Sequence, residues 1–203
     1  MTGVIDYGVG NLFSLMSSLK AVGEQAELSS DPSVLRACDR IILPGVGAFR
    51  AAMDKLKEKK LDAFVKDYAA TGKSVMGICL GMQLLFDKSY EFGVTDGLGL
   101  IRGEVLPLED ALKEKGFDYK VPHMGWNSVE NLRSGLFTGI DQGTYVYYVH
   151  SFAPEVNADT IATTTYGVPF SAAIRKDNFY GTQFHPEKSA SIGAQILQNF
   201  LTL

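Results

Sequence analysis

The sequence predicts an α/β fold: a mostly parallel central sheet flanked by helices, with an antiparallel C-terminal extension. Two observations predict it. In the first half of the chain, short apolar segments alternate with stretches of helical periodicity, which is the pattern of strand–helix–strand units. From residue 144 onward, strand-like segments follow one another without helices between them. The chain has no internal repeat, low-complexity tract or linker, so we expect residues 1–203 to form a single domain.

The strand-like segments of the first half are short, apolar and bounded by turns. The third ends abruptly at Pro44-Gly45, and the fourth runs directly into Cys79. In a parallel sheet, the loops that follow such strands lie at the same edge, where open α/β sheets bind ligands. The expected strands lie at residues 3–6, 25–28, 40–43, 74–78, 144–152, 160–166, 170–175 and 180–184.

Helix signals separate the early strands. Leu12, Leu15 and Leu19 share one face at the helical period, and Asn11 is the expected cap. Asp31 caps a second helix, with proline at its first position. The expected helices lie at residues 11–22, from 31 onward, at 49–71 in two pieces, from 82 onward and at 192–201.

Composition excludes several classes of function. The 203 residues are 46% hydrophobic and 21% charged, with a net charge of −4 and no run of basic residues, which argues against a nucleic-acid binder. The lysines near residue 57 alternate with acidic residues, as on a solvated helix face. No apolar stretch is long enough for a membrane span, and no secretory signal is visible. With only two cysteines, we expect a cytoplasmic protein.

Gly77-Ile78-Cys79-Leu80-Gly81 carries the strongest chemical signal. It joins a strand to a helical stretch and matches the G-x-nucleophile-x-G elbow, with cysteine as the nucleophile. Glycine is needed on both sides because a side chain there would clash with backbone in a strained turn. The N-terminus of the following helix would favour the thiolate. The alternative is a buried structural cysteine, which is our interpretation of Cys38.

His185-Pro186-Glu187 is the second signal. Pro186 disfavours helix, and in an extended chain residues 185 and 187 point to the same side. The carboxylate can then hold one imidazole nitrogen while the other faces a nucleophile, as in a catalytic triad. On its own this motif is more typical of a surface loop, but the cysteine elbow in the same chain reinforces the catalytic interpretation.

Two further groups of residues have the chemistry of a binding site. The N–H groups at Gly45 and Val46, with that of Leu80, can stabilise an oxyanion, although an ordinary strand-ending turn is an equal alternative. Gln83 lies one helical turn after Cys79 and can bind polar groups of a substrate. His123 and His150 have no cysteine or carboxylate at ligand spacing, so we expect no metal and interpret both as structural.

Together these motifs resemble the triad-type, class I glutamine amidotransferases, over most of the chain. Within that family the chain is similar to the glutaminase subunits of imidazole glycerol phosphate synthases. The elbow with Gln83 and the segment around His185 are shared by many members. Three motifs point to the narrower group: Asp-Tyr-Gly-Val-Gly-Asn at residues 6–11, Leu-Pro-Gly-Val-Gly-Ala-Phe at 43–49, and Pro-His-Met-Gly-Trp-Asn at 122–127.

The resemblance implies a flavodoxin-like fold, no cofactor and a Cys-His-Glu mechanism that releases ammonia from glutamine. It implies that ammonia passes to a (β/α)₈-barrel cyclase partner, which makes imidazole glycerol phosphate and aminoimidazole carboxamide ribotide in histidine biosynthesis. It also implies that the peptide at Val46 turns away from the oxyanion site in resting members. The implied site residues are Cys79, His185 and Glu187 for catalysis; Gly45, Val46 and Leu80 for the oxyanion; Gly47, Gln83, His150, Ser151 and Phe152 for the substrate; and Trp126, Tyr147 and Lys188 for the partner.

Two other interpretations remain open from the sequence. One is the glutaminase subunit of another pathway, such as pyridoxal phosphate or anthranilate synthesis, although those subunits tend to have a different oxyanion loop. The other is a non-catalytic redox or stress sensor built on a similar sheet. The carboxylate-held His185 argues against a sensor, which has no need of a base.

Overall fold

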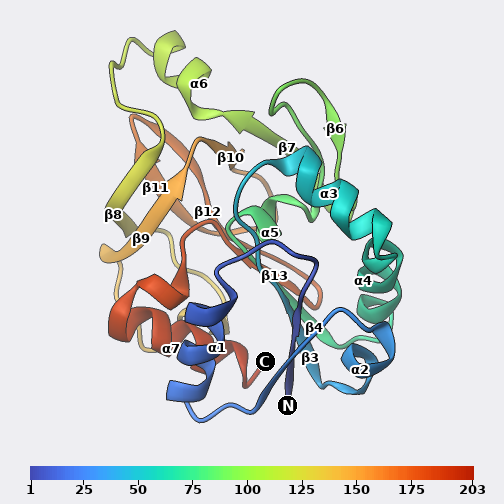
Figure 1. Cartoon of the computed structure of the whole chain (residues 1–203). Helices are drawn as coiled ribbons and strands as arrows, with labels where there is room; N and C mark the ends of the chain where they lie inside the picture. The colour runs from blue at the N-terminus through green and yellow to red at the C-terminus, as the bar shows by residue number, and fades with distance from the viewer.

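The computed structural model describes residues 1–203 and has a seven-stranded central sheet with helices on both faces (Figure 1). The strand order is β11-β12-β13-β4-β3-β1-β2. The strands from β13 to β2 pair in parallel, whereas β12 and β11 extend the sheet antiparallel, which confirms the predicted class. These strands are β1 (Thr2–Ile5), β2 (Ala26–Ser29), β3 (Arg40–Leu43), β4 (Ser74–Ile78), β11 (Thr160–Tyr166), β12 (Val168–Lys176) and β13 (Phe179–Thr182).

Strand alternation explains the two layers of helices. Val4 and Ile42 point into the core cluster beneath α1 and α7, whereas their neighbours Ile41 and Leu43 point into the cluster beneath α3 and α4. Figure 1 shows α1 and α7 on one side of the sheet and α2, α3 and α4 on the other. The helices are α1 (Leu12–Ala21), α2 (Pro32–Ala37), α3 (Phe49–Glu58), α4 (Leu61–Ala69), α5 (Leu80–Gln83), α6 (Leu108–Glu114) and α7 (Ala190–Phe200), with 3₁₀ turns η1 (Gly135–Phe137) and η2 (Pro186–Lys188).

Two smaller sheets were not predicted. One has the order β10-β7-β5-β6, and the other is the antiparallel pair β8–β9. The last strand, β13, lies inside the main sheet parallel to β4, so the extension consists of β11 and β12. The additional strands are β5 (Phe86–Ser89), β6 (Thr95–Asp96), β7 (Ile101–Pro107), β8 (His123–Val129), β9 (Thr144–His150) and β10 (Phe152–Pro154).

The helix expected from Met82 onward is the main local error. The helix α5 ends at Gln83, because the carbonyls of Leu84 and Leu85 accept N–H groups from residues 98, 100 and 101 instead of continuing a helical ladder. The chain then enters β5. Of the two predicted helix caps, one is present. Asp31 accepts the Ser33 N–H at 2.8 Å, whereas the Asn11 side chain makes no capping bond.

The structure contains no helix long and apolar enough to cross a membrane. It also contains no cluster of three or more His, Cys, Asp or Glu side chains that could hold a metal ion.

Candidate active site

Cys79 sits at the strained turn between β4 and α5. Its φ of +53° and ψ of −112° lie in a region that residues with side chains rarely adopt. The flanking glycines make the turn possible. A Cβ on Gly81 would lie 1.9 Å from the Leu43 carbonyl oxygen, and one on Gly77 would lie 2.6 Å from backbone of residues 81 and 82. The predicted elbow and the reason for its glycines are confirmed.

The helix after Cys79 is too short to stabilise the thiolate through its dipole in the way that the sequence predicts. The helix α5 has four residues, so its dipole is that of a single turn. The local N–H groups remain, and that of Leu80 makes no hydrogen bond within the protein. A negative charge near Cys79 is therefore stabilised by individual donors rather than by a long helix.

His185 and Glu187 form a close pair beside the elbow. The imidazole Nδ1 lies 2.7 Å from Glu187 Oε1, and both side chains are almost fully buried. Nε2 of His185 is buried without a hydrogen-bond partner. The predicted pairing is therefore present, and His185 has the extended backbone expected, but residues 186–188 form a turn instead of continuing an extended chain. Pro186 begins the 3₁₀ turn η2, where its missing N–H costs nothing.

The ionisation of His185 is set by its two neighbours. Burial alone lowers the pKa of His185, but the Cys79 sulfur and the Glu187 carboxylate outweigh burial and raise the pKa to about 10. His185 therefore carries a proton at neutral pH, which it can give to a leaving group.

A cavity of about 300 Å³ opens above the sulfur, a volume suited to a small metabolite. It brings together most of the residues that the sequence singled out, and its lining comes from six separate segments of the chain. Its lining residues are Val46, Gly47, Cys79, Leu80, Gln83, Glu91, Pro122, Val149, His150, Ser151, Phe152 and His185.

The loop after β3 forms one wall of this cavity. Val46 is 40% exposed, and its N–H and that of Gly47 make no hydrogen bond within the protein. Gly47 has a φ of +87°, which favours glycine. Gly45 lies outside the cavity lining and packs under the elbow, where a Cβ would meet the Gly81 nitrogen at 2.6 Å. Thus Val46 and Leu80 present free donors, whereas Gly45 allows the loop to approach Cys79.

Gln83 and His150 are tied together through the Phe152 carbonyl. That oxygen accepts an N–H from Gln83 Nε2 at 2.8 Å and one from His150 Nδ1 at 2.9 Å. The second amide hydrogen of Gln83 is donated to Gln183, so its Oε1 is left for a ligand. His150 Nε2 is bonded to His123, so the His150 ring positions Phe152 and has no free nitrogen for a substrate.

Glu91 was missed from the sequence. It is the only acidic side chain in the cavity wall, and its Oε2 accepts the Phe49 N–H at 2.6 Å. That bond fixes the carboxylate at the start of α3. No local pattern points to Glu91, because it follows β5 in a region where the apolar pattern from Met82 onward predicts a helix.

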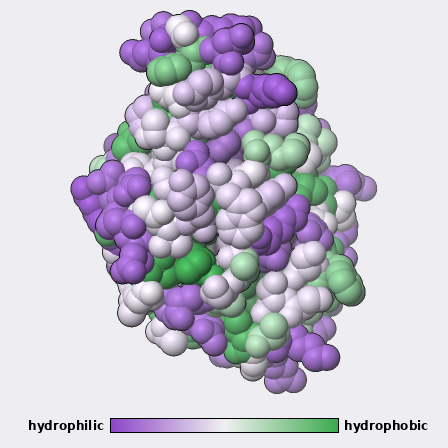
Figure 2. Space-filling view, turned by 90° about the vertical axis from the view of Figure 1, so that its left-hand side faces the viewer, coloured by the Kyte–Doolittle hydropathy of each residue, from purple (hydrophilic) through white to green (hydrophobic).

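Trp126, Tyr147 and Lys188 meet on the surface next to the triad. Trp126 pairs with Tyr147 across β8 and β9, and Lys188 Nζ lies 5.6 Å from the Tyr147 ring centre. Trp126 is 52% exposed, and Met124 and Tyr145 on the same face are 62% and 59% exposed. We define Met124, Trp126, Tyr145, Tyr147 and Lys188 as the β8–β9 face. Figure 2 shows this side of the molecule with a pale centre and the most hydrophilic side chains mainly at the edges.

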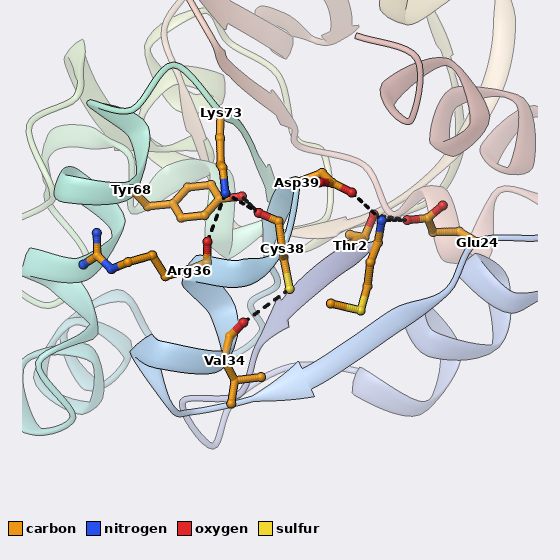
Figure 3. A network of polar contacts seen from close by, with 9 residues as sticks. Thr2, Glu24, Val34, Arg36, Cys38, Asp39, Tyr68 and Lys73 are labelled. Carbon is orange, nitrogen blue, oxygen red and sulfur yellow. Dashed lines mark hydrogen bonds and ion pairs between the residues drawn. The ribbon is translucent and has the colours of Figure 1, made fainter.

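Cys38 has a different setting, between α2 and the amino end of β3, and Figure 3 shows its polar neighbours. Its Sγ lies 3.7 Å from the Val34 carbonyl oxygen, and its own carbonyl accepts from Tyr68 and Lys73. Burial raises the pKa of the Cys38 thiol, which keeps it protonated and unreactive. This agrees with the structural role expected for it.

Comparison with known families adds an independent result. The "Glutamine amidotransferase class-I" family matches residues 3–203. Among curated proteins, the imidazole glycerol phosphate synthase subunit HisH of Wolinella succinogenes is 46% identical over 98% of both chains. The protein of the same name from Bacillus subtilis is 48% identical over 98% of this chain and 95% of its own.

Solved structures with the same fold are more distant in sequence. A glutamine amidotransferase has a TM-score of 0.75 at 17% identity, covering 99% of this chain and 97% of its own. PurLQS from Thermotoga maritima has a TM-score of 0.73 at 18% identity with the same coverage. At these identities the likeness concerns the fold alone.

Proposed function

The chain belongs to the class-I glutamine amidotransferase family, and on that premise we propose that it is the glutamine-hydrolysing subunit of imidazole glycerol phosphate synthase. It converts glutamine to glutamate and ammonia, and a cyclase partner subunit uses the ammonia in histidine biosynthesis. The full-length identity of 42–48% to subunits of that name supports the narrower assignment.

The observation that carries the proposal is the Cys79–His185–Glu187 arrangement. An elbow cysteine, a histidine with one unpartnered buried nitrogen, and a carboxylate 2.7 Å from the other nitrogen form the parts of a nucleophile, base and orienting group. All three lie at the carboxyl edge of the parallel sheet, next to a cavity of about 300 Å³.

The proposed reaction proceeds in two steps. The Cys79 thiolate attacks the side-chain amide carbon of glutamine, and the oxyanion accepts N–H groups from Val46 and Leu80. His185 then gives its proton to the departing nitrogen, which leaves as ammonia and a thioester remains. In the second step His185 takes a proton from water, the hydroxide attacks the thioester, and glutamate is released with Cys79 restored.

Substrate recognition follows from the charges in the cavity wall. Glutamine carries an α-ammonium group, and Glu91 is the acidic side chain available to pair with it. Gln83 offers its free Oε1 as an acceptor for a substrate N–H, because both of its own hydrogens are already used. The Ser151 hydroxyl and the Gly47 N–H have no partner within the protein and supply donors for the α-carboxylate.

We propose that the cyclase, a (β/α)₈ barrel, docks against the β8–β9 face. That face is aromatic and exposed, which is typical of an interface core. It lies next to the triad, because the His185 N–H bonds the Tyr147 carbonyl at 2.9 Å. Ammonia released at Cys79 would then have a short path to the partner.

Glutamate formation measured for the chain alone, with the cyclase, and with the cyclase plus its ligand tests this function. Glycines on both sides of Val46 make its peptide easy to rotate, and one oxyanion donor is worth about 10²–10³ in rate. We expect slow turnover alone and an increase of about that size with partner and ligand. No glutamate under any of the three conditions would reject the function, whereas equal rates would reject only the rotation.

A further inference from the structure

Gln183 is a buried polar side chain that the mechanism above does not use. It follows β13, and its side chain is fully buried against the elbow. Its Nε2 lies 3.6 Å from Cys79 Sγ, and its Oε1 accepts an N–H from Gln83 Nε2 at 2.9 Å. Both the nitrogen and the oxygen of this buried amide have hydrogen-bond partners, so the side chain has a defined orientation beside Cys79.

The direction of the Gln183 amide is determined by the Phe152 carbonyl. A carbonyl oxygen only accepts, so the atom of Gln83 that faces it must be the donor nitrogen. The other hydrogen of that nitrogen points to Gln183, which must therefore present its oxygen. The remaining end of the Gln183 amide is its nitrogen, and that nitrogen faces the sulfur.

The same carbonyl is held from its other side. His150 Nδ1 must carry a proton to donate to Phe152, so His150 Nε2 accepts from His123 Nδ1 at 3.0 Å. His123 Nε2 in turn accepts from Asn127 Nδ2 at 3.3 Å. The Asn127 amide is oriented independently, because its nitrogen also donates to the Thr165 carbonyl and its oxygen accepts the Ser128 N–H. Every hydrogen-bond direction in this chain is thereby consistent.

We propose that Gln183 is a further catalytic residue, which donates an N–H to the Cys79 thiolate. The chain from Asn127 through His123, His150, Phe152 and Gln83 holds this donor in place. The donor stabilises the thiolate before attack, and again when the thiolate leaves the thioester. This role rests on the proposed function for its place in a reaction, but the contact with the sulfur does not depend on it.

Alkylation of Cys79 by iodoacetamide tests the contact without any turnover. The Gln183→Met variant keeps the side-chain length and removes the donor. The rate of Cys79 alkylation in the full chain is measured by mass spectrometry from pH 5 to pH 9. We expect it to fall about tenfold at pH 7, with the midpoint of the pH profile moved up by about one unit.

A second variant and a control sharpen the test. The Gln183→Glu variant keeps the shape of the side chain and the bond from Gln83, but it turns an oxygen toward the sulfur. At pH 8 we therefore expect alkylation of Cys79 to be slower than in wild type by about tenfold or more. Gln195→Met removes a glutamine that bonds Asn199 at 3.0 Å on α7, and it leaves the profile unchanged. If Gln183→Met does not fold, Gln183→Glu decides alone.

Profiles of both Gln183 variants that coincide with that of wild type would overturn the proposal. In the complex with the cyclase, the Gln183→Met variant is also expected to lower kcat about tenfold with little change in KM. A wild-type complex that forms no glutamate would instead reject the proposed function, and the alkylation result would still stand.

Discussion

The two ring nitrogens of His185 have different surroundings, and this difference defines its role. Nδ1 is paired with Glu187 at 2.7 Å, whereas Nε2 is buried without a partner. The pairing fixes the tautomer and the ring orientation, so in the proposed mechanism the free nitrogen is the one that exchanges protons with Cys79 and the substrate. Loss of the His185 ring and loss of the Glu187 charge should therefore have unequal effects on activity.

We predict that His185→Ala lowers glutaminase turnover about a hundredfold more than Glu187→Gln does. Alanine removes the proton carrier, whereas glutamine keeps the size of the orienting group and loses only its charge. Both variants are assayed as complexes with the cyclase under the same conditions. If His185→Ala proved the milder change, the roles assigned to the two residues would be wrong.

A second residue-level prediction concerns stability in acid. Burial lowers the pKa of His123 to about 4 and, with His123 and His185 nearby, lowers that of His150 to about 3. In the unfolded chain both titrate near 6.5, so the unfolded state binds protons first as the pH falls. The stability from these neutral rings is complete above pH 6.5 and is lost below it. His185 has a raised pKa, so the stability that it contributes is complete below pH 6.5 and is lost as the pH rises above that value.

The free energy of unfolding, measured with urea, should fall by about 3 kcal/mol between pH 7 and pH 5. His123→Phe keeps the aromatic stack with Tyr148 and Tyr166 but has no proton to gain, so about half of this dependence should disappear. An unchanged slope in that variant would show that these rings are not the source of the acid sensitivity.

Residue chemistry was predictable where backbone and side chain impose it together. The glycines of the elbow and the His185–Glu187 pair have local signatures, because each depends on residues close in sequence. Glu91 and Gln183 have none. Their positions depend on contacts with Phe49, 42 residues away, and with Gln83, 100 residues away, and no local pattern contains such contacts.

At the scale of elements, the short helix α5 and strand β5 explain both the success and the error in this region. The elbow was predicted because glycine and strand patterns are local. The end of α5 was not, because Leu84 and Leu85 continue an apolar helical pattern, and the helix stops only because residues 98, 100 and 101 donate to their carbonyls. Tertiary hydrogen bonds here override local propensity.

We predict that Gly81→Ala destabilises the fold by about 3 kcal/mol, because its Cβ would lie 1.9 Å from the Leu43 carbonyl oxygen. The backbone of β3 or α5 must shift, which also moves the Leu80 N–H. Thermal unfolding should show the loss as a midpoint lower by about 6–12 °C. Gly135→Ala is the matched control, since its Cβ would meet only the end of the flexible Leu203 side chain. Equal effects of the two variants would contradict this account of the elbow.

At the scale of the whole molecule, the parallel sheet brings the site together. The loops after β3, β4 and β13 end at one edge, so Val46, Cys79 and His185 meet although they are far apart in sequence. The meeting of these three loops at one edge could be predicted from the fold class. The positions of β8, β9 and β10 did not, because they belong to separate small sheets whose packing has no local signal.

The β8–β9 face gives a prediction about assembly. We expect Trp126→Ala and Lys188→Ala each to weaken binding of the cyclase about tenfold or more, because aromatic and cationic side chains dominate interface energies. Isothermal titration of the two subunits measures the affinity. Val156→Ala, an exposed apolar residue outside this face, is the control and should leave it unchanged. Wild-type affinity in both face variants would place the cyclase elsewhere.

We propose that Cys79 releases the amide nitrogen of glutamine for use by the cyclase. Transfer of nitrogen from amide-labelled glutamine into the cyclase product tests it most directly, with wild-type and Cys79→Ser complexes compared. We predict that wild type transfers the label and that Cys79→Ser transfers none, while the variant complex still forms product from an ammonium salt. Label transfer by Cys79→Ser at more than a few per cent of the wild-type rate would show that a group other than Cys79 releases the nitrogen.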